Sequence, residues 1–328
     1  MENINLKKAI SEIEKKFGRG AVIPLTGEVD RSVKKISSGL LSLDLALGGG
    51  YPRGRIIEIY GPESSGKSTV LLEALAIAQK SGKAVAYIDT EHSFDPIYGE
   101  NLGLDLSAEK FIFSQPSTGE EAFGIVEELL KSEAVVFIGV DSVAALIPRA
   151  ELEGEMGESK MGLHARLMSQ AMRKLAGLIS KTDCIVFFTN QLRDKIGVIY
   201  GPTETTTGGN ALKFYASIRM DIRRRSIEKD GDGTAISNVV KIKVVKNKVA
   251  PPFKETELTI EYGTGFDKAA DLLSLAVDKD IIKKAGSWYS YGATKLGQGK
   301  DSVIALIKED YDLQEALLKE VKKQYYLD

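Results

Sequence analysis

The feature that most constrains the fold is a glycine-bounded loop between an apolar strand and a helix. Residues 56–72 read IIEIYGPESSGKSTVLL, and the segment from Gly61 to Ser68 has the spacing Gly, four residues, Gly-Lys-Ser. This spacing is typical of a nucleotide phosphate loop. Glycines such as Gly66 let backbone N–H groups point toward phosphate oxygens, and the N-terminus of the following helix adds partial positive charge. We expect Lys67 to reach the β- and γ-phosphates and Ser68 to ligate Mg²⁺.

The overall composition is that of a soluble globular protein with little net charge. The 328 residues are 43% hydrophobic and 27% charged, and the formal net charge is −2. Because the whole chain is slightly acidic, any surface that binds nucleic acid must be local. The single cysteine, Cys184, lies in an apolar run and is expected to be buried. No apolar run approaches the ~18 residues of a membrane span, and residues 1–8 lack a signal-peptide region, so we expect a cytoplasmic protein without a membrane span.

Two further apolar runs lead to acidic residues. Residues 84–89 and 134–141 read as buried parallel strands; Glu91 follows the first, and Asp141 ends the second. Ligands of open α/β sheets lie beyond the carboxyl ends of the strands. We therefore expect Asp141 to hold Mg²⁺ directly or through water. Glu91 has two interpretations: a base or orienting group for the attacking water, or a solvated loop carboxylate.

Two stretches without apolar periodicity follow strands of this predicted sheet. Residues 150–162 are glycine-containing and predict a mobile loop, and residues 192–212 read as irregular. Both should emerge at the nucleotide edge, which suggests surfaces whose order depends on the γ-phosphate. Gln191, at the root of the second stretch, could hydrogen-bond that phosphate.

A local basic region covers residues 219–248, with nine Lys or Arg residues against four acids. One interpretation is a surface that contacts phosphate backbones. The other is a solvated hairpin, because residues 239–245 alternate and residues 230–233 predict a turn.

The two ends of the chain differ in character from its centre. Residues 3–17 predict an amphipathic helix, whose apolar stripe packs either on its own domain or on a neighbouring subunit. From residue 267 we expect a small α+β domain, with helices at 267–277 and 302–325 and an aromatic turn at 286–292. The lysines that flank this turn suggest a face for duplex DNA.

Several of these segments, taken together, resemble the bacterial RecA recombinase family. They are GPESSGKS at 61–68, EH at 91–92, DPIY at 95–98, VDSVAAL at 140–146, MSQAMRKL at 168–175, TTTGGNALKF at 205–214 and KNK at 246–248. The resemblance runs nearly end to end. It implies an α/β fold: a RecA-like core with a mostly parallel twisted sheet flanked by helices. It also implies three parts, which are an N-terminal oligomerisation helix and linker at 1–32, an ATPase core at 33–266 and a C-terminal α+β domain at 267–328.

The resemblance implies a site for ATP and Mg²⁺, in which Ser68 and Asp141 serve the metal. Glu91 would activate the water, Gln191 would sense the γ-phosphate, and Lys246 and Lys248 would reach the ATP of a neighbouring subunit. The implied nucleotide-binding residues are Gly61, Pro62, Glu63, Ser64, Ser65, Gly66, Lys67, Ser68, Thr69, Asp95, Tyr98, Asp141 and Tyr262.

The resemblance further implies a DNA-dependent ATPase that forms a head-to-tail helical filament on single-stranded DNA and catalyses homologous pairing and strand exchange. Its expected partners include double-stranded DNA, an SOS repressor whose self-cleavage it activates, and recombination mediator proteins. The implied contacts to single-stranded DNA are Met161, Arg166, Ser169, Arg173, Ile196, Gly208, Gly209 and Asn210. The implied duplex contacts are Arg223, Arg224, Lys241 and Lys243.

Three other functions remain open at this level. A ring-forming, helicase-like motor would use similar phosphate chemistry to separate strands. A DNA-binding scaffold that uses ATP only as a switch would not need Glu91. A small-molecule kinase would need an acceptor pocket with a lid, and no segment resembles one.

Overall fold

A computed structural model describes residues 4–18, 21–22, 33–155, 162–194 and 203–327. The chain divides into two compact units, residues 1–33 and residues 34–328. Each unit is described by itself below. Within the described residues, no helix is long and apolar enough to cross a membrane.

Among the described residues of the N-terminal unit, Ile4–Phe17 form the helix α1, which confirms the predicted amphipathic helix. Its apolar stripe includes Leu6, Ile13 and Phe17, and none of its described residues is buried. A helix of this length is marginal alone in water and gains most of its stability by packing an apolar face. That this stripe docks on a neighbouring subunit stays a prediction.

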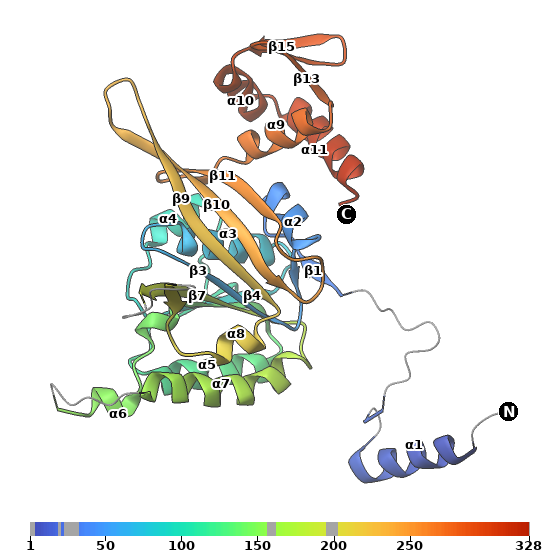
Figure 1. Cartoon of the computed structure of the whole chain (residues 1–328), viewed down its shortest axis with the longest axis vertical. Coiled ribbons are helices and arrows are strands. Elements are labelled where there is room, and N and C mark those ends of the chain that lie inside the picture. Colours follow the sequence, from blue (N-terminus) through green and yellow to red (C-terminus); the bar gives the residue numbers. More distant parts are fainter. Residues whose placement is uncertain (1–3, 19–20, 23–32, 156–161, 195–202, 328) are drawn as a thin grey trace. The chain divides into compact units, whose positions relative to one another are not determined.

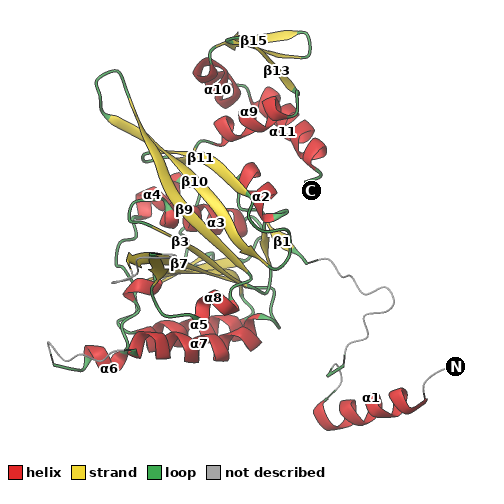
Figure 2. Cartoon of the chain, viewed as in Figure 1, coloured by secondary structure: helices red, strands yellow, loops and turns green. Residues whose placement is uncertain are grey.

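The larger unit is organised around a ten-stranded sheet with the order β12-β11-β10-β9-β3-β7-β6-β4-β5, with β8 paired to β7 (Figures 1 and 2). The six strands from β9 to β5 in this order are parallel, and the remaining pairs are antiparallel. The predicted α/β fold with a mostly parallel central sheet is therefore confirmed. The strands are β3 (Ile56–Gly61), β4 (Ala84–Asp89), β5 (Phe111–Ser114), β6 (Val135–Asp141), β7 (Ile185–Asp194), β8 (Glu204–Thr206), β9 (Ile218–Lys229), β10 (Ala235–Asn247), β11 (Glu255–Glu261) and β12 (Gly265–Phe266).

Helices cover both faces of the sheet (Figure 2). On one face Leu71 and Leu75 of α3 pack with Phe137 and Phe187 in one apolar cluster. On the other face α5, α7 and α8 contribute to a second cluster. A Cβ at Gly139 would lie 2.6 Å from the Leu71 side chain, so this glycine permits the close approach of α3 to β6. The helices are α2 (Leu41–Leu47), α3 (Lys67–Gln79), α4 (Pro96–Asn101), α5 (Gly119–Ser132), the 3-10 turn η1 (Val143–Ala145), α6 (Arg149–Leu152), α7 (Leu163–Ile179) and α8 (Ala211–Tyr215).

Cys184 lies just before β7 and is buried, as its apolar surroundings predict. Burial raises the pKa of its thiol to about 12.

A small two-stranded sheet, β1 (Lys35–Ile36) with β2 (Tyr51–Pro52), encloses α2 in sequence and precedes β3.

The C-terminal residues form a third apolar cluster, from Ala269 to Val321. Their elements are α9 (Lys268–Asp278), β13 (Ile282–Ala285), β14 (Trp288–Tyr291), β15 (Thr294–Gln298), α10 (Lys300–Glu309) and α11 (Tyr311–Tyr325). The predicted aromatic turn is wrong, because Trp288–Tyr291 is the central strand of an antiparallel sheet. Residues 302–325 are helical as predicted, in two helices that meet at Asp310, whose side chain caps α11 by accepting from the N–H of Leu313.

The two predicted loops are partly regular. Residues 149–152 are helical, whereas a loop was expected from residue 150. Strand β7 extends to Asp194 and pairs with β8, so that Leu192 opposes Thr206. Ladder partners ten to fourteen residues away stabilise this segment, and no local periodicity reveals such partners. Residues 156–161 and 195–202 lie outside the described part of the chain.

Candidate nucleotide site and DNA-facing surfaces

The phosphate loop joins β3 to α3 and is shaped by two glycines. Gly66 caps α3 with φ 93°, a left-handed conformation that glycine adopts at little cost. A Cβ at Gly61 would lie 2.2 Å from the carbonyl oxygen of Ile222 on β9. Lys67 donates to the carbonyl oxygens of Gly61 (3.2 Å) and Pro62 (2.7 Å), and burial lowers the pKa of its ammonium group. The loop therefore holds a partly desolvated cation beside the half-buried N-terminus of α3.

A cavity of about 390 Å³ lies over this loop. It brings together residues from β3, α3, β4, β6, β7, β10 and β11 or from the segments that follow them. The lining residues named from the sequence are Glu63, Ser64, Ser65, Gly66, Lys67, Ser68, Thr69, Glu91, Tyr98, Asp141, Gln191 and Tyr262. The lining residues that sequence reasoning missed are Asn238, Ile260, Glu261 and Gly263. Gly61, Pro62 and Asp95 are not among the lining residues.

Asp141 ends β6 and is 2% exposed. Its carboxylate accepts hydrogen bonds from Tyr87 (2.9 Å) and Thr189 (2.5 Å), and Ser68 also hydrogen-bonds to it. Burial is the main cause that raises the pKa of Asp141. The Ser68 hydroxyl and the Asp141 carboxylate supply the hard oxygen ligands that Mg²⁺ prefers, with phosphate oxygens and water completing the shell. These two oxygen ligands therefore fit a Mg²⁺ ion.

Glu91 follows β4 and is held by two donors on one oxygen. The Ser142 hydroxyl donates to Glu91 Oε1 at 2.6 Å, and Gln191 Nε2 donates to the same atom at 3.0 Å. Ser142 follows β6, and Gln191 lies within β7. The parallel sheet thus places three neighbouring strand ends together at its carboxyl edge, as expected. Although Glu91 is exposed, it is an anchored group that faces the phosphate loop across the cavity.

The far end of the cavity has aromatic character. Tyr98 shares a hydrogen bond with Thr69 of α3 (3.1 Å), and the Tyr262 hydroxyl donates to Asn238 (2.8 Å). Asp95 caps α4 by accepting from the N–H groups of Ile97 (2.9 Å) and Tyr98 (3.3 Å). Asp95 therefore orients Tyr98, and its own contact with adenine stays a prediction.

Lys246 and Lys248 lie at the end of β10 and are not among the residues that line the cavity. Lys246 donates to the carbonyl oxygens of Lys213 (2.6 Å) and Phe214 (3.0 Å), and Lys248 donates to that of Phe214 (3.2 Å). These carbonyls belong to α8. Burial, together with the charges of Lys248 and Arg219, lowers the pKa of Lys246 to about 8. The Phe214 side chain beside them is 74% exposed.

The residues implied to touch single-stranded DNA gather on α7 and the segment before α8. Gly208 and Gly209 have φ 78° and 75°, and a Cβ at either would crowd Met168 or Ala165 of α7. The glycines therefore let this segment lie directly on α7. Arg166 and Arg173 are exposed on the same helix. The Ser169 hydroxyl donates to the carbonyl oxygen of Ala165 within α7, and Asn210 is the N-cap residue of α8. Met161 and Ile196 lie outside the described residues.

The basic region is a hairpin of β9 and β10, as the alternation predicts. Arg223 and Lys241 are direct partners across these strands. Arg223 donates to Glu204 (2.6 Å) and Asp221 (2.6 Å), and Lys241 donates to Glu255 (2.5 Å). Arg224 is exposed, and Lys243 lies opposite Asp221 and Glu255. Glu204 and Glu255, which lie outside residues 219–248, therefore pair with its basic side chains, and the composition of that region alone did not reveal them.

A phosphate loop at the carboxyl edge of a mostly parallel sheet, with acidic groups from the next two strands, is typical of phosphate-loop nucleotide-binding proteins. The comparisons with known proteins narrow this class. A family model described as the RecA N-terminal domain matches residues 4–267, and one described as the RecA C-terminal domain matches residues 270–326. The chain belongs to the RecA family.

Curated relatives match along nearly the whole chain. One named Protein RecA, from Clostridioides difficile, is 52% identical over 324 residues, which cover 98% of this chain and 92% of the relative. Another Protein RecA, from Chlorobaculum parvum, is 55% identical over 324 residues, with coverages of 98% and 92%. A third, from Porphyromonas gingivalis, is 53% identical over 319 residues, with coverages of 97% and 93%.

Proposed function

We propose that this protein is a DNA-dependent ATPase that acts as a recombinase in DNA repair. The observation that carries the proposal is the anchored Glu91, which shares one cavity with the phosphate loop, Asp141 and Gln191. This arrangement suits hydrolysis of a nucleoside triphosphate. The names of the relatives and the two family matches support the recombinase role.

In this proposal the loop N–H groups and Lys67 bind the triphosphate. Glu91 orients the attacking water and accepts its proton, while Ser142 and Gln191 keep its Oε1 in place. A Mg²⁺ ion held by Ser68 and Asp141 would neutralise developing charge on the phosphates. In this proposal Gln191 is the γ-phosphate sensor, and its hydrogen bond to Glu91 supports that role, because a bound γ-phosphate would compete for the same amide.

We further propose that the site is completed by a second subunit. Lys246 and Lys248 are occupied with α8 carbonyls and do not line the cavity of their own chain. Reaching the ATP of the next subunit would make them the counterpart of an arginine finger. A head-to-tail contact of this kind gives a helical filament, with α1 docking on the neighbour.

DNA would bind on two surfaces of the filament. Single-stranded DNA would lie on α7 and on Gly208, Gly209 and Asn210, and duplex DNA would meet the β9–β10 hairpin. Basic groups would neutralise the backbone, and base pairing would read homology for strand exchange. Activation of SOS-repressor self-cleavage, binding of mediator proteins and a cytoplasmic location complete the proposal as predictions.

The first test measures ATP hydrolysis with and without single-stranded DNA in the wild type, Lys67→Ala and Lys248→Ala. We expect strong stimulation by DNA in the wild type and its loss in both variants. Lys80→Ala is the matched control, because Lys80 is an exposed lysine at the other end of α3. Its stimulation should equal that of the wild type.

Other outcomes point to the other functions. Turnover that needs no DNA and survives Lys248→Ala would exclude the shared site. DNA-stimulated turnover with strand separation and no strand exchange would favour a helicase-like motor. DNA binding that responds to ATP without any turnover would favour a scaffold.

A further inference from the structure

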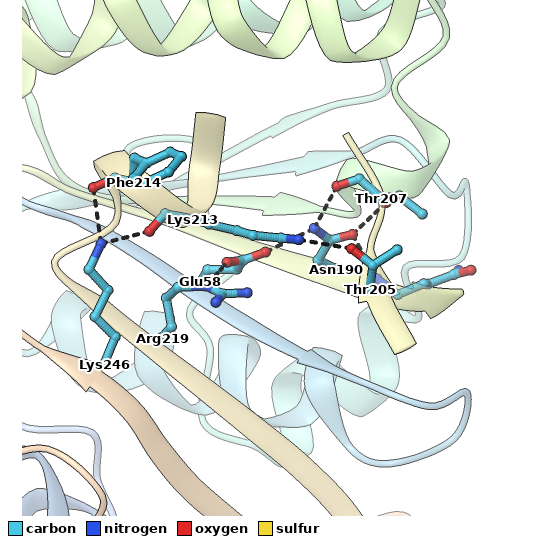
Figure 3. Close-up of polar contacts among 9 residues, drawn as sticks. Glu58, Asn190, Thr205, Thr207, Lys213, Phe214, Arg219 and Lys246 are labelled. Carbon is cyan, nitrogen blue, oxygen red and sulfur yellow. Dashed lines mark hydrogen bonds and ion pairs between the residues drawn. The ribbon is translucent and has the colours of Figure 1, made fainter. Parts of the chain in front are cut away.

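A buried polar group lies behind the phosphate loop, formed by Glu58 of β3 and Asn190 of β7 (Figure 3). Both side chains are 0% exposed. The parallel register pairs Glu58 with Phe188 and Tyr60 with Asn190, so the two polar side chains leave the same face of the sheet. Asn190 Nδ2 donates to Glu58 Oε1 at 2.9 Å. The proposed nucleotide chemistry uses neither residue.

The Asn190 amide uses its full hydrogen-bonding capacity. Nδ2 donates to Glu58 and to the carbonyl oxygen of Thr207 (3.2 Å). Oδ1 accepts from the Gln191 N–H (2.8 Å) and from the Thr207 hydroxyl (2.5 Å). Turning the amide over would place its NH₂ group against the Gln191 N–H and its oxygen against a carboxylate. Glu58 therefore helps to select one orientation.

That orientation fixes two features of the site at once. The Gln191 backbone is held by Asn190, while the Gln191 side chain donates to Glu91. Thr207, held by the same amide, directly follows β8, whose ladder with β7 flanks residues 195–202. A single buried amide thus sets the position of Gln191 and of the chain that returns to α7.

Glu58 is itself fixed from a third strand. Arg219 of β9 donates through Nε to Glu58 Oε2 at 2.5 Å, and its guanidinium lies 4.7 Å from the Tyr60 ring centroid. Arg219 is the register partner of Lys246 on β10. Figure 3 shows this group beside α8, where Lys213 donates to Thr205 of β8 (2.8 Å) and Lys246 donates to α8 carbonyls.

We propose that Glu58 is a positioning residue for ATP hydrolysis. By orienting the Asn190 amide it holds Gln191 beside Glu91 and keeps β8 and the following Thr207 in one register with β7. This inference rests on the proposed function for its kinetic part. Its structural part, the orientation of Asn190 by Glu58, stands on the contacts alone.

The test exchanges the carboxylate of Glu58 and the amide of Asn190. Glu58→Gln removes the carboxylate, and Asn190→Asp places two carboxylates face to face. The double variant Glu58→Gln/Asn190→Asp restores one amide–carboxylate pair with the donor reversed, and its new carboxylate still accepts from Gln191 and Thr207. We expect Glu58→Gln to lower kcat with single-stranded DNA about tenfold, with KM for ATP within about twofold of the wild-type value. Asn190→Asp should lower kcat further than Glu58→Gln does. The double variant should recover part of the kcat that Asn190→Asp loses.

Hydrogen exchange of the Gln191 N–H supplies a readout that does not depend on turnover. Its exchange should accelerate in both single variants and slow again in the double variant, while binding of a fluorescent ATP analogue is retained. Glu257→Gln is the matched control, because Glu257 is a surface carboxylate of β11 paired with Arg225. It should leave exchange and kcat unchanged.

The outcomes separate this inference from the proposed function. If the wild type does not hydrolyse ATP, the proposed function fails, and hydrogen exchange alone decides whether Glu58 fixes Asn190. If the wild type is active but Glu58→Gln matches it in kcat and exchange, the inference is overturned. A double variant no better than Asn190→Asp would overturn it as well.

Discussion

The cavity over the phosphate loop and the β9–β10 hairpin both carry charged side chains, but they hold them in different ways. In the cavity, Asp141 is buried and Glu91 is anchored by two donors from neighbouring strand ends. On the hairpin, Arg223 and Lys241 pair with acids at the surface. Exposed ion pairs contribute little to stability, typically about 0–1 kcal/mol, so their partners are easily exchanged. The cavity thus fixes the geometry of its charged groups, whereas the duplex contact proposed for the hairpin requires phosphates to replace its acids.

The largest effect should come from removing the charge of Glu91. Glu91→Gln retains the hydrogen-bonding shape but removes the base, and we expect kcat to fall roughly 10²- to 10⁴-fold. Affinity for ATP, measured by equilibrium binding, should change little. Turnover that persists in this variant would show that the cavity does not fix a catalytic carboxylate. The comparison of fixed charges in the cavity with exchangeable ion pairs on the hairpin would then be wrong.

An intermediate effect is expected at Lys246, where β10 leaves the hairpin and reaches α8. With a pKa of about 8, its side chain is a cation below that pH and becomes neutral above it. If the charge serves hydrolysis, kcat/KM for ATP, which reports the groups of the free enzyme, should fall roughly tenfold between about pH 7 and about pH 9. Arginine stays charged over this range, so Lys246→Arg should flatten the profile in the same assay. If the kcat/KM of Lys246→Arg falls with rising pH as much as that of the wild type, the group that titrates is not Lys246.

The smallest effect should come from the hairpin itself. Glu255→Gln removes the acid that pairs with Lys241, and we expect duplex DNA to bind a few-fold more tightly, with a steeper salt dependence. Lys241→Ala should weaken binding and reduce the salt slope by about one. Fluorescence anisotropy at several salt concentrations measures both. Asp105→Asn, which removes an acid paired with Lys110 on another surface, is the control.

The sequence predicted the parallel sheet and the phosphate loop well, because both depend on local patterns. Short apolar runs bounded by glycine or acidic residues marked β3, β4 and β6. Since parallel strands place their carboxyl ends at one edge, Glu91, Asp141 and Gln191 were expected together, and they line one cavity.

What the sequence did not predict depends on partners far along the chain. The β7–β8 ladder joins Leu192 to Thr206, and β14 forms from aromatic residues that resembled a turn. Glu58 was overlooked although a carboxylate within an apolar strand is itself a signal of a buried pair. Its partners Asn190 and Arg219 are 132 and 161 residues away, and only the fold identifies them.

The burial of Cys184 makes this chain convenient for site-specific labelling. Only the thiolate reacts with alkylating dyes, and a thiol with a pKa of about 12 supplies almost none at neutral pH. Because the sequence contains no other cysteine, a variant such as Lys80→Cys would present a single reactive thiol. Energy transfer between chains labelled there with donor and acceptor dyes would test the proposed assembly in real time, without first replacing the native cysteine.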